Sequence, residues 1–487
     1  MRRLGLAAMG LFLGWGSISA QNAYDALSIS REDPILGTAR YSAMAGAFGA
    51  FGANATTMKD NPAGLGVYSK WDFTFTPNLY VTNDNSLGCN INNFGLVINF
   101  ANSGKKNGYV TSSFGISYNR LKNFDRYSSI KRRNQAYSMT DVMANQASNA
   151  VRDAGWDLML LNDDYTSTLK EGELIDSRVR FKEKGGMGEW DFSYGMNVSN
   201  RFYWGIGLGV TSLDYTQKTC YDELFYDPDE NWYLDNYYEA SGSGFNFKLG
   251  AIARVTDFFR LGLAFHTPTF WTIDQYTDQN MDYQDKYADV ARTEISSTDL
   301  SYDLQTPLKL QASMGFVIGK KAVVGLEYQY ADYSAMRITD VDGDVFGNYR
   351  DSQDKMRWTS AYVDFDETDE KERINEYMAA THTIKAGAEV NINKYFAARL
   401  GAAFVTAPVK DDAYENYYNS DYPVSLPQET LYFTGGFGYR AQSFYVDLAA
   451  VYKRQQEKLY DYLPNKTPIS DDALTNLNIM ATLGWKF

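Results

Sequence analysis

The sequence is poor in cysteine and histidine. Its 487 residues include two cysteines, Cys89 and Cys220, and two histidines. So few thiol and imidazole ligands argue against a zinc cluster, and we expect neither a metal nor a cofactor. We place both cysteines in loops, where they either pair in an oxidising compartment or remain two free thiols.

Positive charge is also scarce. Forty-six Lys and Arg face sixty Asp and Glu, which gives a net charge of −14. Nucleic-acid binding needs a basic surface, so this balance argues against a nucleic-acid partner.

Long apolar runs are missing after the N-terminus. Without a run of about eighteen apolar residues, membrane-spanning helices are not expected. A β-barrel is not excluded by this test, because only alternate residues of its strands face lipid. The length of the chain allows either two or three ordinary domains or one large barrel.

Residues 1–20 have the three parts of a secretory signal. Arg2 and Arg3 are the charged start, residues 4–15 are the apolar centre, and small residues end at Ala20. We therefore expect cleavage before Gln21 and an exported protein.

Alternating apolar and polar residues recur from about residue 70 onward. The pattern has the period of a β-strand, and the last strand ends on the aromatic Phe487, as strands of outer-membrane barrels do. About fourteen such segments fit the even strand number of these barrels: 71–75, 94–100, 114–118, 190–198, 204–210, 245–251, 261–265, 310–316, 324–330, 384–390, 396–404, 433–439, 444–450 and 476–487. The fold class is therefore all-β, a transmembrane antiparallel barrel over residues 71–487.

Short and long connections alternate between these segments. The long ones, roughly 120–186, 218–241, 269–304, 335–380, 407–429 and 455–475, are predicted to be extracellular loops. The short turns are then periplasmic, in the outer membrane of a Gram-negative cell. Expected partners are outer-membrane lipid, lipopolysaccharide and, through the C-terminal strand, the barrel-assembly machinery.

The stretch 140–161 has apolar residues at mixed helical spacing and is predicted to be a helix in the first long loop. Its apolar side chains would form either a landing surface for a greasy ligand or a small packed cap.

Glycines mark the inward faces of several predicted strands. A strand glycine either bends the barrel or allows another backbone to approach closely. By parity the inward set is Gly205, Gly207, Gly209, Gly262, Gly315, Gly325, Gly436, Gly438 and Gly484. The Ala- and Gly-rich stretch within residues 21–70 is a candidate for the approaching segment, so we expect an N-terminal plug inside the lumen. Asn61, Pro62, Ala63 and Gly64 form a strong turn signal within it.

Charged residues of both signs are also predicted to face the lumen. The acids are Glu327, Glu389 and Asp447, and the bases are Lys248, Arg254, Lys309, Lys385 and Arg399. Most would form ion pairs with neighbouring strands or with the plug, and one or two of the bases would be left to hold a ligand carboxylate.

Together, the small-residue N-terminal plug ending in NPAGL, the fourteen or so strands and the terminal aromatic resemble the FadL/TodX family of outer-membrane transporters for hydrophobic compounds. The strings 261–270, 306–316 and 387–404 are similar to hairpins of that family.

The resemblance implies a passive transporter for long-chain fatty acids or aromatic hydrocarbons, and no enzyme. It implies that the plug is a hatch whose NPA element matches Asn61, Pro62 and Ala63. It also implies a lateral exit at a kink in the third strand, which would fall near Ser112, Ser113 and Gly115. The acidic, Tyr-rich outer loops depart from the family pattern, so the ligand is either a fatty acid, an aromatic compound or a larger lipid-like molecule.

Other functions remain open at this stage. A general diffusion porin for polar solutes would need an open charged bore without a plug. A haem- or lipid-binding receptor would use Tyr or His ligands. An enzyme would need a nucleophile beside a histidine, but His266 is predicted to face inward and His382 outward.

Overall fold

The structure is a computed structural model. It describes residues 17–487 apart from short segments at 101–106, 137, 146–148, 169–172, 225–230, 285–289, 320, 351–355, 363–364, 412–423 and 461–469. Among the described residues, no helix combines the length and the apolar run that a membrane crossing requires.

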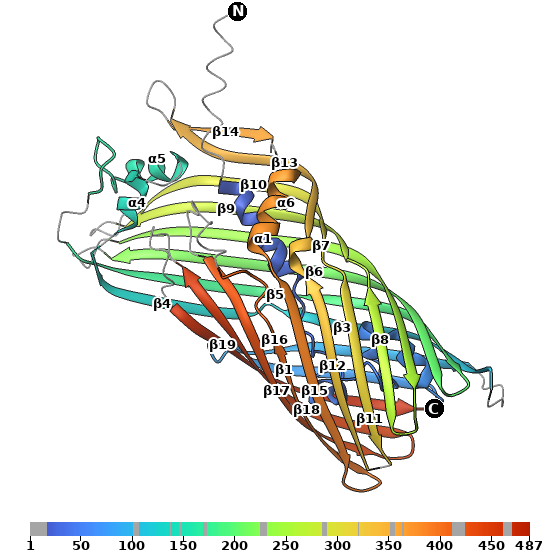
Figure 1. The fold of residues 1–487 in the computed structure, drawn as a ribbon. Coiled ribbons are helices and arrows are strands. Elements are labelled where there is room, and N and C mark those ends of the chain that lie inside the picture. The colour runs from blue at the N-terminus through green and yellow to red at the C-terminus, as the bar shows by residue number, and fades with distance from the viewer. Residues whose placement is uncertain are drawn as a thin grey trace, which may run out of the picture.

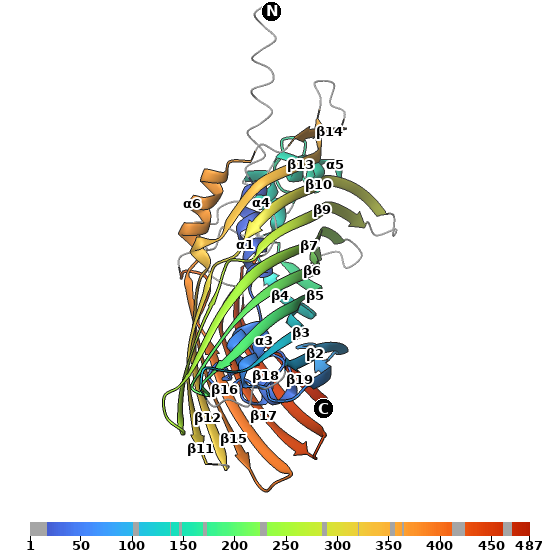
Figure 2. The same cartoon turned by 90° about the vertical axis from the view of Figure 1, so that its right-hand side faces the viewer.

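Fourteen antiparallel strands close into one β-barrel, as the sequence predicts (Figures 1 and 2). Some of these strands consist of two labelled segments, so a complete strand of the barrel is called a stave and the labels β1 to β19 are kept for the segments. The barrel closes where β1 (Asp72–Val81) pairs with the C-terminal strand β19 (Ser470–Lys486) on one side and with β2 (Leu87–Phe100) on the other. The staves that consist of one strand segment each also include β5 (Ile175–Val198), β6 (Phe202–Leu224), β7 (Asn231–Arg254), β16 (Phe396–Val405), β17 (Val424–Arg440) and β18 (Phe444–Tyr460).

Each of the other five staves consists of two segments in sequence. They are β3 (Tyr109–Asn123) with β4 (Arg126–Gln135), β8 (Phe259–His266) with β9 (Phe270–Gln284), β10 (Val290–Gln305) with β11 (Lys309–Ile318), β12 (Ala322–Asp332) with β13 (Arg337–Arg350), and β14 (Met356–Tyr362) with β15 (Ala380–Asn391). The neighbouring stave shows the continuity: β5 pairs with both β3 and β4, and β7 pairs with both β8 and β9.

The predicted long loops are largely wrong in their extent. β4, β9, β10, β13 and β14 lie within ranges that the sequence assigned to loops, as do the outer ends of β5, β6, β7, β17, β18 and β19. With 24 residues, β5 is roughly 80 Å long at 3.3 Å per residue, far more than a bilayer requires. The outer part of such a strand faces water, so it lacks the apolar outer face by which strands were recognised.

The strand alternation separates a lipid-facing surface from the lumen. On β7, the side chains of Phe245, Phe247 and Leu249 are about half exposed on the outside, whereas Asn246 and Lys248 between them are buried in the lumen. An apolar outer face with a polar interior is the pattern of outer-membrane barrels.

The N-terminal segment lies inside the barrel (Figures 1 and 2). It contains α1 (Ser17–Ser30), α2 (Ala39–Ala43), α3 (Thr57–Asp60) and the 3-10 turn η1 (Pro62–Val67). Between Ile35 and Leu65 most of its side chains are buried. The helix α2 contacts β16–β19, and η1 contacts β3, β5, β6 and β7 on another part of the wall. The placement of this segment agrees with the predicted plug.

Helices lie at the outer end of the barrel (Figures 1 and 2). α4 (Met139–Asn145) and α5 (Asn149–Asp157) fall in the range predicted to be helical, and α6 (Glu367–Tyr377) follows β14. Met143, Val151 and Ala154 of α4 and α5 are fully buried in one cluster with Trp232 of β7. The stretch 140–161 therefore forms the packed cap and not the exposed landing surface.

Both cysteines lie in strands, which corrects their assignment to loops. Cys89 is in β2 and Cys220 in β6, and both are free thiols. Neither cysteine lies in a predicted strand segment, because the residues around each of them are mostly polar.

Candidate functional site

Wall glycines allow the backbone of the N-terminal segment to lie directly against the barrel. A Cβ on Gly205 of β6 would stand 2.6 Å from the amide nitrogen of Ala63, and one on Gly387 of β15 would stand 2.8 Å from Cβ of Met44. Gly262, Gly315, Gly325 and Gly436 face the same segment. Any larger residue would collide with the segment, so the close approach predicted from the sequence is confirmed at these positions.

The remaining predicted glycines serve other contacts. Gly209 and Gly438 leave room for charged side chains that reach across them from neighbouring strands, Gly207 leaves room for the hydroxyl of Ser193, and Gly484 lies under the ring of Tyr445. All nine predicted glycines therefore meet lumen groups, but not all of them meet the N-terminal segment.

The Asn61–Gly64 turn links the two halves of the segment and one wall. The Asn61 side chain is buried; its Nδ2 donates to the carbonyl oxygen of Gly49 at 2.8 Å and its Oδ1 accepts from the amide of Ala63 at 3.1 Å. Pro62 begins η1, where its fixed φ and missing N–H cost nothing. The carbonyl of Gly64 accepts from the amide of Ala53 at 3.1 Å.

Two ion-pair networks join the segment to the opposite wall. Glu389 of β15 accepts from Arg40 of the segment at 2.7 Å and from Arg399 of β16 at 2.6 Å, and Arg399 also donates to Asp447 of β18 at 2.6 Å. Nearby, Glu327 of β12 accepts from Lys385 at 2.9 Å and from the amide of Gly49 at 2.9 Å. Lys385 and Arg399 are therefore occupied by partners.

The other three predicted bases are also paired. Lys248 of β7 contacts Glu189 and Asp191 of β5 across Gly207 and Gly209, and all three charged side chains are at most 2% exposed. Lys309 pairs with Glu32 of the segment. Arg254 lies at the short turn and pairs with the exposed Asp257 at 3.0 Å.

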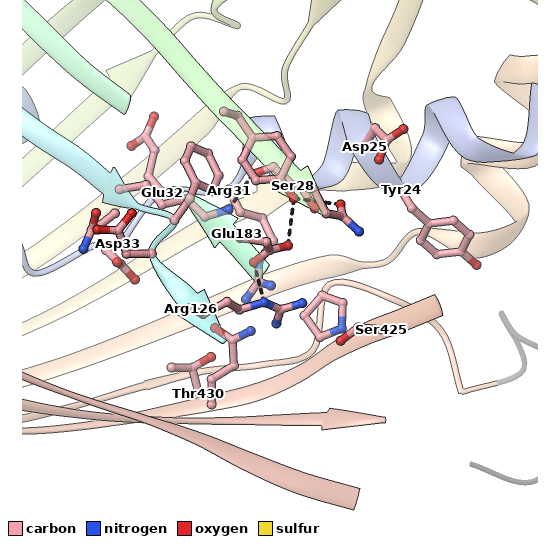
Figure 3. A pocket seen from close by; sticks show the side chains of 18 of the residues that line it. Tyr24, Asp25, Ser28, Arg31, Glu32, Asp33, Arg126, Glu183, Ser425 and Thr430 are labelled. Carbon is pink, nitrogen blue, oxygen red and sulfur yellow. Dashed lines mark hydrogen bonds and ion pairs between the residues drawn. The ribbon is translucent and has the colours of Figure 1, made fainter. Parts of the chain in front are cut away.

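A cavity of about 280 Å³ lies in the lumen between this segment and the barrel wall (Figure 3). Its floor includes Arg31, Asp33 and Asp60, and its walls come from β3–β7, β9, β10 and the C-terminal strands. The wall of β6, β7, β9 and β10 presents mainly uncharged polar side chains, among them Gln217, Thr219, Asn236, Gln275 and Thr298. The cavity is therefore polar on most sides, with Tyr and Phe rings between the polar groups.

Sequence reasoning missed the charged residues on the β3–β4 side of the cavity. Lys122 of β3 donates to the carbonyl of Ser28 at 2.5 Å, and Arg126 of β4 contacts Glu183 and Glu457. These residues fell in the range 120–186 that was assigned to a loop. The sequence 126–135, RYSSIKRRNQ, shows no apolar alternation by which this strand could have been found.

Two acids with raised pKa values lie on α1 and α6, two helices that contact each other. Asp25 of α1 is buried near Glu183 and Glu370, and burial first and these negative charges second raise the pKa of Asp25 to about 8. Burial raises the pKa of Glu370 in α6 to about 7, with Arg373 opposing the shift. Tyr24 stacks on Tyr377 at 6.1 Å and 10° between the same two helices.

The third stave is regular at Ser112, Ser113 and Gly115 and irregular on either side of them. These three residues pair without interruption with both β2 and β5, whereas register shifts on the β5 side fall at 109–111, next to Ser112, and at 120–122. A Cβ on Gly115 would stand 3.1 Å from the side chain of Leu65, so this glycine is explained by the close approach of the N-terminal segment.

The two histidines lie apart, on opposite faces of the wall. His266 contacts the carbonyl oxygen of Asp60 at 2.7 Å in the lumen, and His382 contacts the hydroxyl of Tyr328 on the outer face. Within the described part of the chain, no group of three His, Cys, Asp or Glu is placed to hold a metal ion.

No family model and no curated protein matches this sequence. Solved structures do match its fold. The CymD monoaromatic hydrocarbon channel shares 12% identity, with 94% of this chain and 98% of that chain covered at a TM-score of 0.53. The Pseudomonas putida toluene transporter TodX shares 12% identity, with 93% and 99% covered at 0.52, and a Pseudomonas aeruginosa FadL homologue shares 12%, with 93% and 98% covered at 0.50. The chain thus has the fold of the FadL-type outer-membrane channels.

Proposed function

We propose that this protein is a passive outer-membrane channel for hydrophobic molecules, with residues 21–70 as a hatch that blocks the lumen. The observation that carries the proposal is the seat of the N-terminal segment, whose backbone lies against wall glycines and whose Arg40 is paired to Glu389. A general diffusion porin would need an open bore at this level, so the seated segment counts against that alternative. No energy source is required, because the apolar solute moves down its own gradient.

The lining of the cavity refines the ligand class. The similar channels are described as carrying toluene or other monoaromatic hydrocarbons. Here the cavity presents Arg31, Lys122 and Asp33 together with amides and hydroxyls, and burying such groups against a pure hydrocarbon is costly. The proposed ligand is therefore an amphiphile, with an apolar body and a polar head, of which a long-chain fatty acid is one example.

A lateral exit is proposed at the seam between β2 and β3. Their ladder ends at the pair Asn93–Asn119. Above it the tip of the β1–β2 hairpin is held to the next stave by side chains: Asn83 Nδ2 donates to the carbonyl of Tyr127, and Tyr80 donates to Asp125. Side-chain contacts are easier to open than a strand ladder, and the cavity reaches Asn83 and Asp125. This position replaces the Ser112–Gly115 kink as the proposed gate.

Deletion of 21–64 tests the hatch. In planar bilayers the intact protein should show little conductance, and the deletion variant should show a large steady pore and lose selective uptake of a fluorescent fatty acid in cells. Unchanged conductance and uptake would reject the hatch, and a large pore in the intact protein would support the porin instead. A Soret band on adding haemin would favour the haem receptor.

Cross-linking tests the exit. Cysteines placed at Ile91 and Arg120, in a Cys89→Ser/Cys220→Ser background, would be joined across the seam by a short bifunctional thiol reagent. Uptake should fall after cross-linking, and the same reagent on each single-cysteine variant is the control. Normal uptake with a complete cross-link, verified by mass spectrometry, would place the exit elsewhere.

A further inference from the structure

Basic side chains gather on the outward face of the barrel, on the outer ends of β4, β5 and β6. On β5 the even positions from Arg178 to Lys184 alternate with buried residues such as Val179 and Phe181, so they point away from the lumen. The cross-strand pairs Lys131–Arg178 and Lys182–Lys218 extend the same face onto β4 and β6. The basic patch consists of Lys131, Arg178, Arg180, Lys182, Lys184 and Lys218.

The patch is exposed and has little internal compensation. Lys131, Lys182, Lys184 and Lys218 are exposed, and the side chains of Arg178 and Arg180 are 34% and 32% exposed. Within the patch the acid is Asp222, which both arginines cover. Asp176 shares the outward face of β5 with Arg178, and Asp214, Asp235 and Glu239 border the patch on β6 and β7. In a chain with a net charge of −14, six clustered cations are a local reversal of sign.

The height of the patch above the membrane narrows the choice of partner. The outward row Trp190–Val210–Phe245 is the last apolar row on these strands. Lys184 lies six residues further out on β5, which is roughly 20 Å along the strand and about 14 Å in height at a 45° tilt. Phospholipid headgroups extend only about 5–7 Å beyond the hydrocarbon, so the patch stands above them.

We propose that this patch binds the phosphate groups on the core sugars of lipopolysaccharide molecules that surround the barrel. Lipopolysaccharide is the outer-leaflet component whose anionic groups extend to this height. Arg and Lys donate charge-assisted hydrogen bonds to phosphate oxygens, and a cluster of such side chains can hold several phosphates at once. The proposal concerns the outer wall and does not depend on the ligand or the hatch.

The test compares a patch variant with a charge-matched control. The variant Lys182→Gln/Lys184→Gln/Lys218→Gln removes three patch cations, and Arg292→Gln/Lys371→Gln/Lys394→Gln removes three exposed cations elsewhere. Purified full-length proteins in non-ionic detergent are titrated with rough-type lipopolysaccharide, and binding is followed by native mass spectrometry. The patch variant should bind about tenfold more weakly, the equivalent of about 1.4 kcal/mol, and the control should bind as the unchanged protein does.

Two further probes identify the group that is recognised. Lipopolysaccharide stripped of phosphate should bind the unchanged protein as weakly as intact lipopolysaccharide binds the patch variant, and neither phosphatidylglycerol nor inorganic phosphate should compete at equal concentration. The proposal would be overturned if the patch variant and the control bound lipopolysaccharide equally well, or if removing phosphate did not weaken binding. Competition by phosphatidylglycerol or by inorganic phosphate would also overturn it. Heat-modified mobility on gels verifies that each variant is folded.

Discussion

Gly205 of the barrel wall and Ala63 of the N-terminal segment approach so closely that a side chain on the glycine would displace the segment. A Cβ at residue 205 would stand 2.6 Å from the amide nitrogen of Ala63, below any distance that real Cβ atoms adopt. The lumen wall and the segment are therefore complementary at the level of the backbone at this point.

We expect Gly205→Ala to loosen the seat of the segment and to raise conductance in planar bilayers. The control is Gly435→Ala, because a Cβ at that position would stand an ordinary 3.5 Å from Leu400. Equal conductance of the two variants would show that the seat tolerates a methyl group.

Asn61→Ala should release the turn that links the two halves of the segment. The variant loses the bond to Gly49 and leaves that buried carbonyl unsatisfied, which costs about 1–3 kcal/mol. Limited proteolysis from the periplasmic side should then cut the segment faster. Pro62→Ala should have a smaller effect, since it keeps these hydrogen bonds, and an Asn61 variant as resistant as the unchanged protein would contradict this reading.

The contact between α1 and α6 should weaken as pH rises. Asp25 and Glu370 have folded-state pKa values of about 8 and about 7, above their usual values of 3.8 and 4.5. The folded state then holds protons that the undocked state has already released, so docking is strongest near pH 4 and declines until about pH 8. The charged and titratable groups around the pair are Glu183, Arg373, Tyr215, Tyr238, Tyr302 and Tyr377.

Hydrogen exchange of α1 at pH 5 and pH 8.5 measures this dependence. Exchange should be faster at the higher pH after correction for the intrinsic rate, and Asp25→Asn with Glu370→Gln should remove the difference. If the pH dependence of exchange in α1 survived in the double variant, groups other than Asp25 and Glu370 would cause it.

Lys248→Met should destabilise the barrel strongly. Lys248 pairs with both Glu189 and Asp191, and without it these two acids remain buried side by side with no cation between them. Removing one partner of a buried ion network costs about 3–5 kcal/mol. The free energy of unfolding in urea, measured by tryptophan fluorescence, should fall by that amount in Lys248→Met. In Arg254→Met, at the exposed turn, the free energy of unfolding should change by less than about 1 kcal/mol. Similar shifts for both variants would refute the role of the Lys248 network.

The lipid-embedded part of the barrel could be predicted well from the sequence. All fourteen staves were located because lipid demands an apolar residue at every second position, as in Phe245, Phe247 and Leu249 of β7. The inward glycines and the Asn61–Gly64 turn were recognisable for a similar reason, since each is a local backbone requirement.

The outer half of the barrel could not be predicted in this way. β9 and β10 continue above the membrane, where their outward residues are polar because they face water. Their apolar side chains, such as Ile273 of β9 and Leu300 of β10, point inward and are buried, so the apolar outer face that marks the lipid-embedded strands is missing. The partners of the lumen charges were equally hidden, because Arg40 meets Glu389 across 349 positions of sequence.

By itself, the sequence determined the barrel, its strand number and the small residues of its lumen, because these follow from local periodicity against a uniform lipid solvent. Only the tertiary structure decided which charges meet, where the segment sits and what lines the cavity. Those features depend on closure of the barrel, which brings remote strands around one lumen, and the pairing of a charge in that lumen is settled by distance in space and by burial.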